Sequence, residues 1–267
     1  RRISQTANWL TADRLRGSTS ELRTNSTEAE HLISDTGYDQ MTGYYDDSNV
    51  ISDIVSWMWK RAPGYFDAVA YSGTGANRTV SHNVLNVAPE MMWIKCRSAA
   101  ESWAVYHAGI TNPEQNYLYL DETSALNPNA NTIKYWNNTN PTDSVFTVGI
   151  EDRVNGSAKT YISYLFASLA GVSKVGSYVG DGTNNRQIDC GFTTGARFIL
   201  AKNITGGRWD LFDTLRGIGA GNPPRLSLNN TNAEESPADY VDPHSSGFIV
   251  NSPLNDNGDT WIFYAIA

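Results

Sequence analysis

Cysteine, histidine and long apolar runs are scarce in this sequence of 267 residues. Cys96 and Cys190 are too few for a disulfide framework, and each lies at the end of a strand-like run, which favours a small core residue over a nucleophile. The four histidines show neither an i, i+4 pair nor the Cys/His spacing of a zinc site. Because no stretch approaches the ~20 apolar residues of a membrane span, we expect no membrane insertion.

Basic residues are outnumbered by acidic ones. The 20 Lys and Arg against 28 Asp and Glu give a net charge of −8 and a pI near 5.0, and the cations form no stripe. Nucleic acid is therefore not an expected partner, since binding that follows phosphates needs a basic surface. Aromatic residues, by contrast, are abundant: 8 Trp and 14 Tyr provide material for cores and for stacking surfaces.

Comparison of the sequence with itself shows a tandem repeat of roughly 100 residues. A Tyr-x-Gly-x-Gly motif begins at Tyr71 and again at Tyr178, and an apolar run ends at Lys95 and again at Lys202. Both pairs of positions lie 107 residues apart. Each copy closes on an aromatic run preceded by Asn-Gly, a hairpin signal. We therefore assign two whole repeats, a middle repeat (63–169) and a last repeat (170–267).

The N-terminal part of the chain carries the second half of a further copy. The pattern Trp-x3-Asp-x-Leu-Arg-Gly begins at Trp9 and again at Trp209 with identical spacing. Residues 56–59, Ser-Trp-Met-Trp, fall where the closing strands of the other copies fall. Residues 1–62, called the N-terminal segment below, are thus predicted to be the C-terminal half of a partial repeat whose first half lies upstream.

Short runs rich in Val, Ile, Tyr, Phe and Trp alternate with clusters of Gly, Asn, Pro and Thr, the pattern of antiparallel sheets. Helix is expected to be minor, with one weak turn over Ser26–Ile33. The predicted fold class is all-β, with tandem antiparallel β-sandwich units. Seven strands are predicted in each whole repeat, near residues 66–71, 78–84, 90–96, 102–107, 117–121, 144–149 and 160–167, and near 174–179, 186–191, 196–202, 208–212, 225–228, 246–250 and 260–267.

The motifs, taken in order, resemble a known family. Tyr-x-Gly-x-Gly, an apolar strand ending in Lys, Trp-x3-Asp-x-x-Arg-Gly, Leu-x-Leu-Asn and a closing aromatic strand are similar to repeats of bacteriophage tail proteins, particularly from marine phages. The resemblance spans essentially the whole chain and implies jelly-roll sandwiches like concanavalin A or laminin G domains. It further implies a virion location in a tail fibre or appendage. The implied partners are further copies in a homo-oligomer, often a trimer, other virion proteins, and a host-surface glycan or receptor.

Residues that the repeats share are expected to be scaffold, because equivalent units need the same core, whereas copy-specific residues are free to serve recognition. The recurrent Trp and Gly residues, and the Asp–Arg pairs that brace turns, are therefore assigned to packing. The middle repeat has His107 and Ile110 in place of that pair, so the fold does not require it. The recognition candidates, with core packing as their alternative, are Tyr117, Tyr119, Tyr135, Trp136, Asn137 and Asn138.

Catalytic and cofactor patterns are not evident in the sequence. Neighbouring carboxylates such as Glu151-Asp152 lie in polar turns, whereas glycosidases need two carboxylates facing each other across a groove. Calcium at Asp181 or at residues 255–259 is kept only as an alternative, because the second loop lacks a bidentate Glu. The sequence predicts a non-enzymatic virion protein that binds the host surface. The alternatives are a purely architectural virion component, in a capsid decoration or fibre shaft, and a polysaccharide-degrading enzyme on a lectin-like sandwich.

Overall fold

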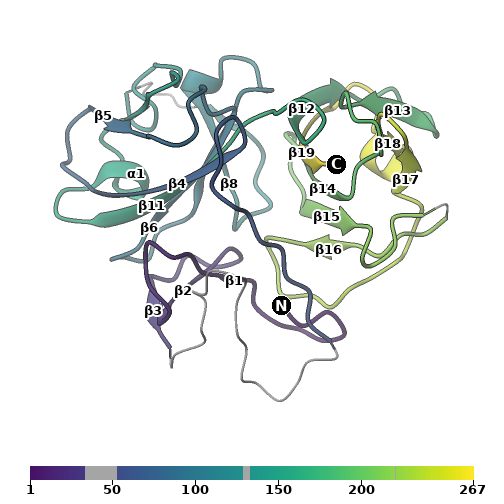
Figure 1. The fold of residues 1–267 in the computed structure, drawn as a ribbon, viewed down its shortest axis with the longest axis horizontal. Coiled ribbons are helices and arrows are strands. Elements are labelled where there is room, and N and C mark those ends of the chain that lie inside the picture. The colour runs from purple at the N-terminus through teal and green to yellow at the C-terminus, as the bar shows by residue number, and fades with distance from the viewer. Residues whose placement is uncertain (34–52, 129–132, 220) are drawn as a thin grey trace.

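The computed structural model describes residues 1–33, 53–128, 133–219 and 221–267, and almost all of its regular structure is antiparallel β-sheet. This confirms the all-β class. The N-terminal segment, the middle repeat and the last repeat form three groups of strands around a common centre (Figure 1). No helix in the described ranges is long or apolar enough to cross a membrane.

The middle repeat contains a six-stranded and a two-stranded sheet, ordered β4-β11-β6-β7-β8-β9 and β10-β5. The closing strand pairs with both β4 and β6, so Tyr161 lies opposite Tyr71 on one side and Cys96 on the other. One 3-10 turn, η1 (Pro113–Gln115), and one helical turn, α1 (Asp152–Asn155), interrupt the loops. The strands are β4 (Phe66–Ser72), β5 (Arg78–Ser81), β6 (Met91–Cys96), β7 (Ala104–His107), β8 (Asn116–Tyr119), β9 (Asn127–Pro128), β10 (Val145–Val148) and β11 (Thr160–Phe166).

The last repeat has sheets ordered β12-β19-β14-β15-β16 and β13-β18-β17, which is the strand order of the middle repeat without a counterpart of β9 and with β17 added at the edge of the small sheet. Its closing strand likewise lies between the first and third strands of the large sheet. A 3-10 turn, η2 (Ser252–Leu254), replaces α1. The strands are β12 (Ser173–Val179), β13 (Arg186–Asp189), β14 (Phe198–Asn203), β15 (Trp209–Asp213), β16 (Leu226–Ser227), β17 (Val241–His244), β18 (Gly247–Val250) and β19 (Thr260–Ile266).

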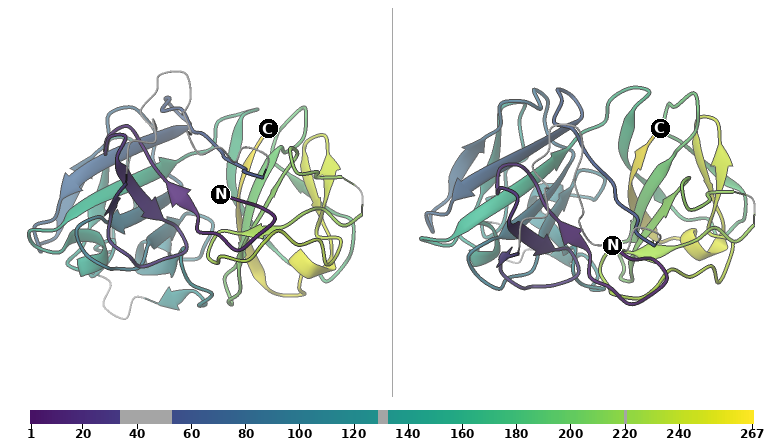
Figure 2. Two further views of the ribbon diagram at one scale, coloured as in Figure 1. Left: turned by 90° about the horizontal axis from the view of Figure 1, so that it is seen from below. Right: turned by 60° about the horizontal axis from the view of Figure 1, so that its bottom comes forward.

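The N-terminal segment forms a small sheet of β1 (Leu10–Thr11), β2 (Ser20–Arg23) and β3 (His31–Leu32). Arg1 and Val55 exchange two backbone hydrogen bonds, in the way that Lys202 in β14 pairs with Ile262 in β19. The segment thus reproduces part of a large sheet, and it runs from the last repeat across to the middle repeat (Figure 2).

The large sheets are apolar on both faces. In β11, Tyr161 and Leu165 point into the sandwich, whereas Ile162, Tyr164 and Phe166 point to the centre of the molecule. There they meet the corresponding face of the last repeat and residues of the N-terminal segment in one central core. Burial on two faces explains why β6 and β14 are buried along their whole length and do not alternate.

All fourteen predicted strands are present, within a few residues of the predicted bounds. Three local predictions were wrong. Residues 26–30 are not helical and lead into β3, residues 56–59 form no strand beyond the pairing at Val55, and Asn155-Gly156 is not a two-residue hairpin because Asn155 ends α1. β17 was missed, since Pro243 argues against a strand except at a sheet edge, where β17 lies.

Candidate functional site

A cyclic set of hydrogen bonds joins the three groups of strands. Each recurrent tryptophan is buried and donates its indole N–H to a backbone carbonyl in another group. The three acceptor residues are equivalent, because each follows a buried leucine of the Leu-x-Leu motif or of its counterpart in the N-terminal segment. Because the N-terminal group donates to the last one, the ring closes. The bonds run from Trp9 to Ser227 (2.7 Å), from Trp103 to Arg23 (2.9 Å) and from Trp209 to Tyr119 (2.9 Å).

A second set of backbone hydrogen bonds repeats the same cycle in the opposite direction. The three donors are again equivalent, because each follows the alanine that the copies share. The three junctions therefore have the same geometry, and the ring has pseudo-threefold symmetry. The amides of Glu30, Leu126 and Glu234 donate to the carbonyls of Arg97 (2.8 Å), Ile204 (2.7 Å) and Ile3 (2.7 Å).

The polar residue of the Leu-x-Leu-Asn motif and the basic residue that ends the apolar strand also serve this ring. In each group a side-chain oxygen accepts the backbone N–H of the tryptophan, from Asn25, Asp121 or Asn229. Lys95 and Lys202 are buried nearby, and burial lowers the pKa of each to about 8. Lys95 Nζ donates to the carbonyl of Thr27 in the N-terminal segment at 2.9 Å.

The recurrent Asp–Arg pair forms the local ion pair that the sequence predicts. Arg216 Nε lies 2.7 Å from Asp213 Oδ2, and both side chains are almost fully buried. The guanidinium of Arg216 also stacks on Trp57, with Cζ 5.8 Å from the ring centre. At the equivalent junction Arg16 donates to the hydroxyl of Tyr164 at 3.1 Å. Each pair therefore stabilises its own turn, while its arginine also contacts a residue of a neighbouring group of strands.

His107 takes the place of the aspartate at the third junction. Its Nδ1 accepts the backbone N–H of Gly109 at 3.0 Å, so the ring proton is on Nε2, which donates to the carbonyl of Phe263 in the last repeat at 3.2 Å. Burial lowers the pKa of His107 to about 4, so the ring at this junction is neutral near pH 7.

The Tyr-x-Gly-x-Gly motif forms a packed turn and no ligand cradle. A Cβ on Gly73 would lie 2.1 Å from the carbonyl oxygen of Gly156, and one on Gly180 would lie 2.0 Å from that of Asp256. Tyr71 and Tyr178 donate their hydroxyls to equivalent carbonyls at 2.6 Å. The buried amides of Asn155 and Asn255 hold the two loops from the other side. The recurrent glycines are scaffold, as predicted.

The recognition candidates of the middle repeat do lie together, as a packed aromatic cluster. Tyr135 and Trp136 are buried, so their rings are closed to a ligand, and Trp136 Nε1 donates to the carbonyl of Asn116 at 2.8 Å. Tyr117 stacks on Tyr135 with ring centres 3.7 Å apart, and the hydroxyls of Tyr119 and Tyr135 are 2.8 Å apart. For Tyr135 and Trp136, the alternative prediction of core packing is therefore the correct one.

The remaining candidates stay at the surface. Tyr117 and Tyr119 are half-buried, and the guanidinium of Arg153 lies over the Tyr119 ring, with Cζ 5.3 Å from its centre. Asn137 and Asn138 have φ values of 51° and 50°, the left-handed conformation that asparagine tolerates, so they form a turn. The cluster therefore offers tyrosine edges and amides, with no open stacking platform.

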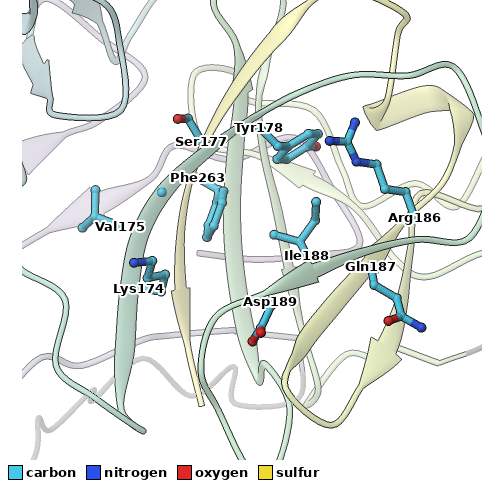
Figure 3. Close-up of a pocket in the computed structure, with 10 residues that line it drawn as sticks. Lys174, Val175, Ser177, Tyr178, Arg186, Gln187, Ile188, Asp189 and Phe263 are labelled. Atoms are coloured by element: carbon cyan, nitrogen blue, oxygen red, sulfur yellow. The ribbon is translucent and has the colours of Figure 1, made fainter.

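A groove that the sequence did not predict lies in the last repeat, between the edge strands β12 and β13. It has a volume of about 390 Å³. Figure 3 shows Lys174 and Asp189 at one end and Tyr178 with Arg186 at the other, with Phe263 and Ile188 between them. Gly176 lies at its centre, and the Phe263 ring packs against it where a side chain would be, because a Cβ on Gly176 would lie 2.5 Å from that ring.

Comparison of the repeats offers a sequence signal for this groove. Gly176 stands where the middle repeat has Val69, in the interior of a strand, and Lys174 stands where it has Asp67. Glycine within a strand marks a bulge or a close approach. Repeat comparison could have found the position, but the burial of its neighbours and the exposure of the strand edges come only from the structure.

The candidate calcium ligands of the sequence form no metal site among the described residues. No cluster of three or more His, Cys, Asp or Glu side chains could hold a metal ion there. The carboxylate of Asp181 has a pKa lowered to about 2, chiefly by hydrogen bonds from Thr183. The Asn255 amide also donates to it, so a turn already uses this candidate calcium ligand.

The fold and these contacts define a class, an all-β protein of tandem sandwich repeats closed into a ring. Residues 1–267 match the family model described as Domain of unknown function (DUF7483), and the chain belongs to that family. The family unit therefore includes the N-terminal segment together with both whole repeats. Searches of curated proteins and of solved structures returned no match.

Proposed function

We propose that the chain is a non-enzymatic structural module of a bacteriophage virion, part of a tail fibre or other appendage, whose copy-specific surfaces bind the host surface. The motif resemblance supports the virion assignment. The structure adds that these motifs are the residues that close the ring and hold the turns. A closed ring with three internal cores suits a rigid particle component.

The observation that carries the proposal is the division between shared and copy-specific residues. Shared polar residues, such as Asp213, Arg216 and Asn255, are bonded inside the scaffold. The groove of the last repeat instead presents copy-specific polar side chains, Lys174, Gln187 and Asp189, at its rim. Binding at a variable surface on a constant frame is the arrangement expected of a recognition module.

An architectural role without receptor binding is the second candidate, favoured by the ring itself. One chain already places three groups of strands around an axis, a shape that can stack along a fibre without contacting a host. The homotrimer implied by the resemblance belongs to this proposal, as do contacts with other virion proteins. For the enzyme alternative, the groove lining contains a single carboxylate, Asp189, where glycoside hydrolysis uses two.

Imaging of intact particles with this chain traced tests the virion assignment. We expect the chain along a fibre axis or at an appendage tip; a particle that lacks it would contradict the proposal. Binding of the purified chain to host cells separates recognition from architecture, and failure to bind would favour the architectural role. Reducing sugar released from host polysaccharide, and abolished by Asp189→Asn, would instead establish the enzyme.

A further inference from the structure

The groove between β12 and β13 combines a shared frame with a copy-specific lining. Tyr178, Arg186 and Ile188 have counterparts of the same kind in Tyr71, Arg78 and Val80 of the middle repeat. The lining differs elsewhere: Lys174, Gly176, Gln187 and Asp189 replace Asp67, Val69, Thr79 and Ser81. The groove is therefore a modification of one repeat and not a by-product of the fold.

The counterpart of Lys174 shows what a structural residue does at this position. Asp67 is fully buried, and both of its carboxylate oxygens have partners: Oδ1 lies 2.7 Å from Arg61 Nε, and Oδ2 accepts the backbone N–H of Val84 at 3.2 Å. Lys174 Nζ and the Gln187 amide form no hydrogen bond or ion pair with any residue that the structure describes. Asp189 uses only Oδ1, which accepts the N–H of Gly191 at 2.8 Å. Hydrogen-bonding groups at the rim thus remain available for a ligand.

The edge of β12 is protected against an added peptide strand. The amide of Val175 donates to Ser168 Oγ at 3.0 Å, and the carbonyl of Val179 accepts a hydrogen bond from Arg186. Strand addition needs a continuous run of free backbone groups, which these contacts interrupt. The occupant is therefore a compact ligand held by side chains.

The lining selects the chemistry of that ligand. Phe263 and Ile188 form an apolar centre with the Lys174 ammonium beside it, and the Gln187 amide and the Asp189 carboxylate lie on the outer side of β13, at the rim (Figure 3). A pyranose ring matches this arrangement, since it has apolar C–H faces and hydroxyls that both donate and accept. About 390 Å³ is at the small end of ligand pockets, roughly 300–1,000 Å³.

We infer that the groove binds one pyranose unit of a glycan, through Lys174, Gln187 and Asp189. That the glycan belongs to a host surface rests on the proposed function, whereas binding of the pyranose itself does not. The middle repeat, which has Asp67, Thr79 and Ser81 at these three positions, is expected not to bind.

Amide NMR titration of the full chain tests this, with D-glucose, D-galactose, D-glucuronate and N-acetyl-D-glucosamine as separate probes. We expect at least one sugar to shift the Gly176, Ser177 and Gln187 amides saturably at millimolar concentration. Shifts confined to other surfaces, or none with any sugar, would overturn the inference.

Variants with matched controls sharpen the test. Lys174→Met and Gln187→Ala are expected to weaken binding by about tenfold each, the effect of one lost hydrogen bond, whereas Thr79→Ala in the middle repeat leaves it unchanged. Unchanged affinity in both polar variants would contradict the inference.

The two proposals fail separately. Host-cell binding that persists in Lys174→Met, together with no sugar-dependent shifts, would overturn the groove inference and leave the host-surface role. Saturable pyranose binding by a chain that intact particles lack would do the reverse.

Discussion

The indole N–H of Trp9 donates to the carbonyl of Ser227, a residue 218 positions further along the chain, at 2.7 Å. This bond closes the ring, because it joins the N-terminal segment to the last repeat. The other two tryptophans make the equivalent bonds, so no group of strands is an appendage of the others.

Replacing Trp209 with phenylalanine should destabilise the chain beyond the loss of ring area. The carbonyl of Tyr119 would lose its indole donor, and an unsatisfied buried group costs about 1–3 kcal/mol. Trp93→Phe is the matched control, since Trp93 is buried and its Nε1 has no partner among the described residues. Denaturant unfolding measures both, and equal losses would show that the Trp209 bond contributes nothing.

Arg216→Met should cost about 3–5 kcal/mol of unfolding free energy, because it leaves the buried carboxylate of Asp213 unpaired. Lys159→Met is the control: Lys159 lies 3.0 Å from both Asp152, whose side chain is 60% exposed, and Glu101, and solvent-accessible pairs of this kind contribute about 0–1 kcal/mol. Thermal unfolding of both variants tests the contrast. A small loss for Arg216→Met would mean that the turn is braced by other contacts.

Gly180→Ala should be strongly destabilising, since its Cβ would lie 2.0 Å from the carbonyl oxygen of Asp256, a backbone atom that cannot move alone. Gly219→Ala should be tolerated, because nothing lies within 4 Å of its Cβ position. Comparison of their melting temperatures checks the scaffold role of the Gly-x-Gly turn. A tolerated alanine at 180 would be inconsistent with that role.

Acid should weaken the junction at His107. Its folded pKa of about 4 lies below the ordinary value near 6.5, so the unfolded chain binds the extra proton first. The stabilisation is complete above pH 6.5 and is lost as pH falls toward 4, by at most about 1.4 kcal/mol per pH unit. Asp210 acts in the opposite sense, because burial raises its pKa to about 6.

His107→Gln separates the two effects, since both proteins retain Asp210. Unfolding free energies measured between pH 8 and pH 4 should fall more steeply for the parent chain than for the variant. Parallel pH profiles would show that His107 is not the acid-sensitive group.

The sequence predicted the strands and the repeat because both depend on local pattern and on residues that recur. Trp9, Trp103 and Trp209 were correctly assigned to the core. Their cyclic hydrogen bonds were not foreseen, because the acceptors are backbone carbonyls, which carry no sequence signal.

The candidate site was harder to predict. Tyr135 and Trp136 are copy-specific and aromatic, yet they are buried, since a copy can differ in its core as well as at its surface. Gly176 was overlooked because its role depends on the Phe263 ring of a neighbouring strand, which packs where a side chain at 176 would be. Copy-specific sequence thus indicates candidate binding residues, and their burial in the structure decides which of them a ligand can reach.

Hydrogen exchange of the indole N–H groups, followed by NMR on the full chain, tests the closed ring most directly. The account predicts that the Trp9, Trp103 and Trp209 indoles exchange slowly and at similar rates, because all three open only when the ring opens. Fast exchange at Trp9 beside slow exchange at Trp103 and Trp209 would show a detached N-terminal segment and would contradict it.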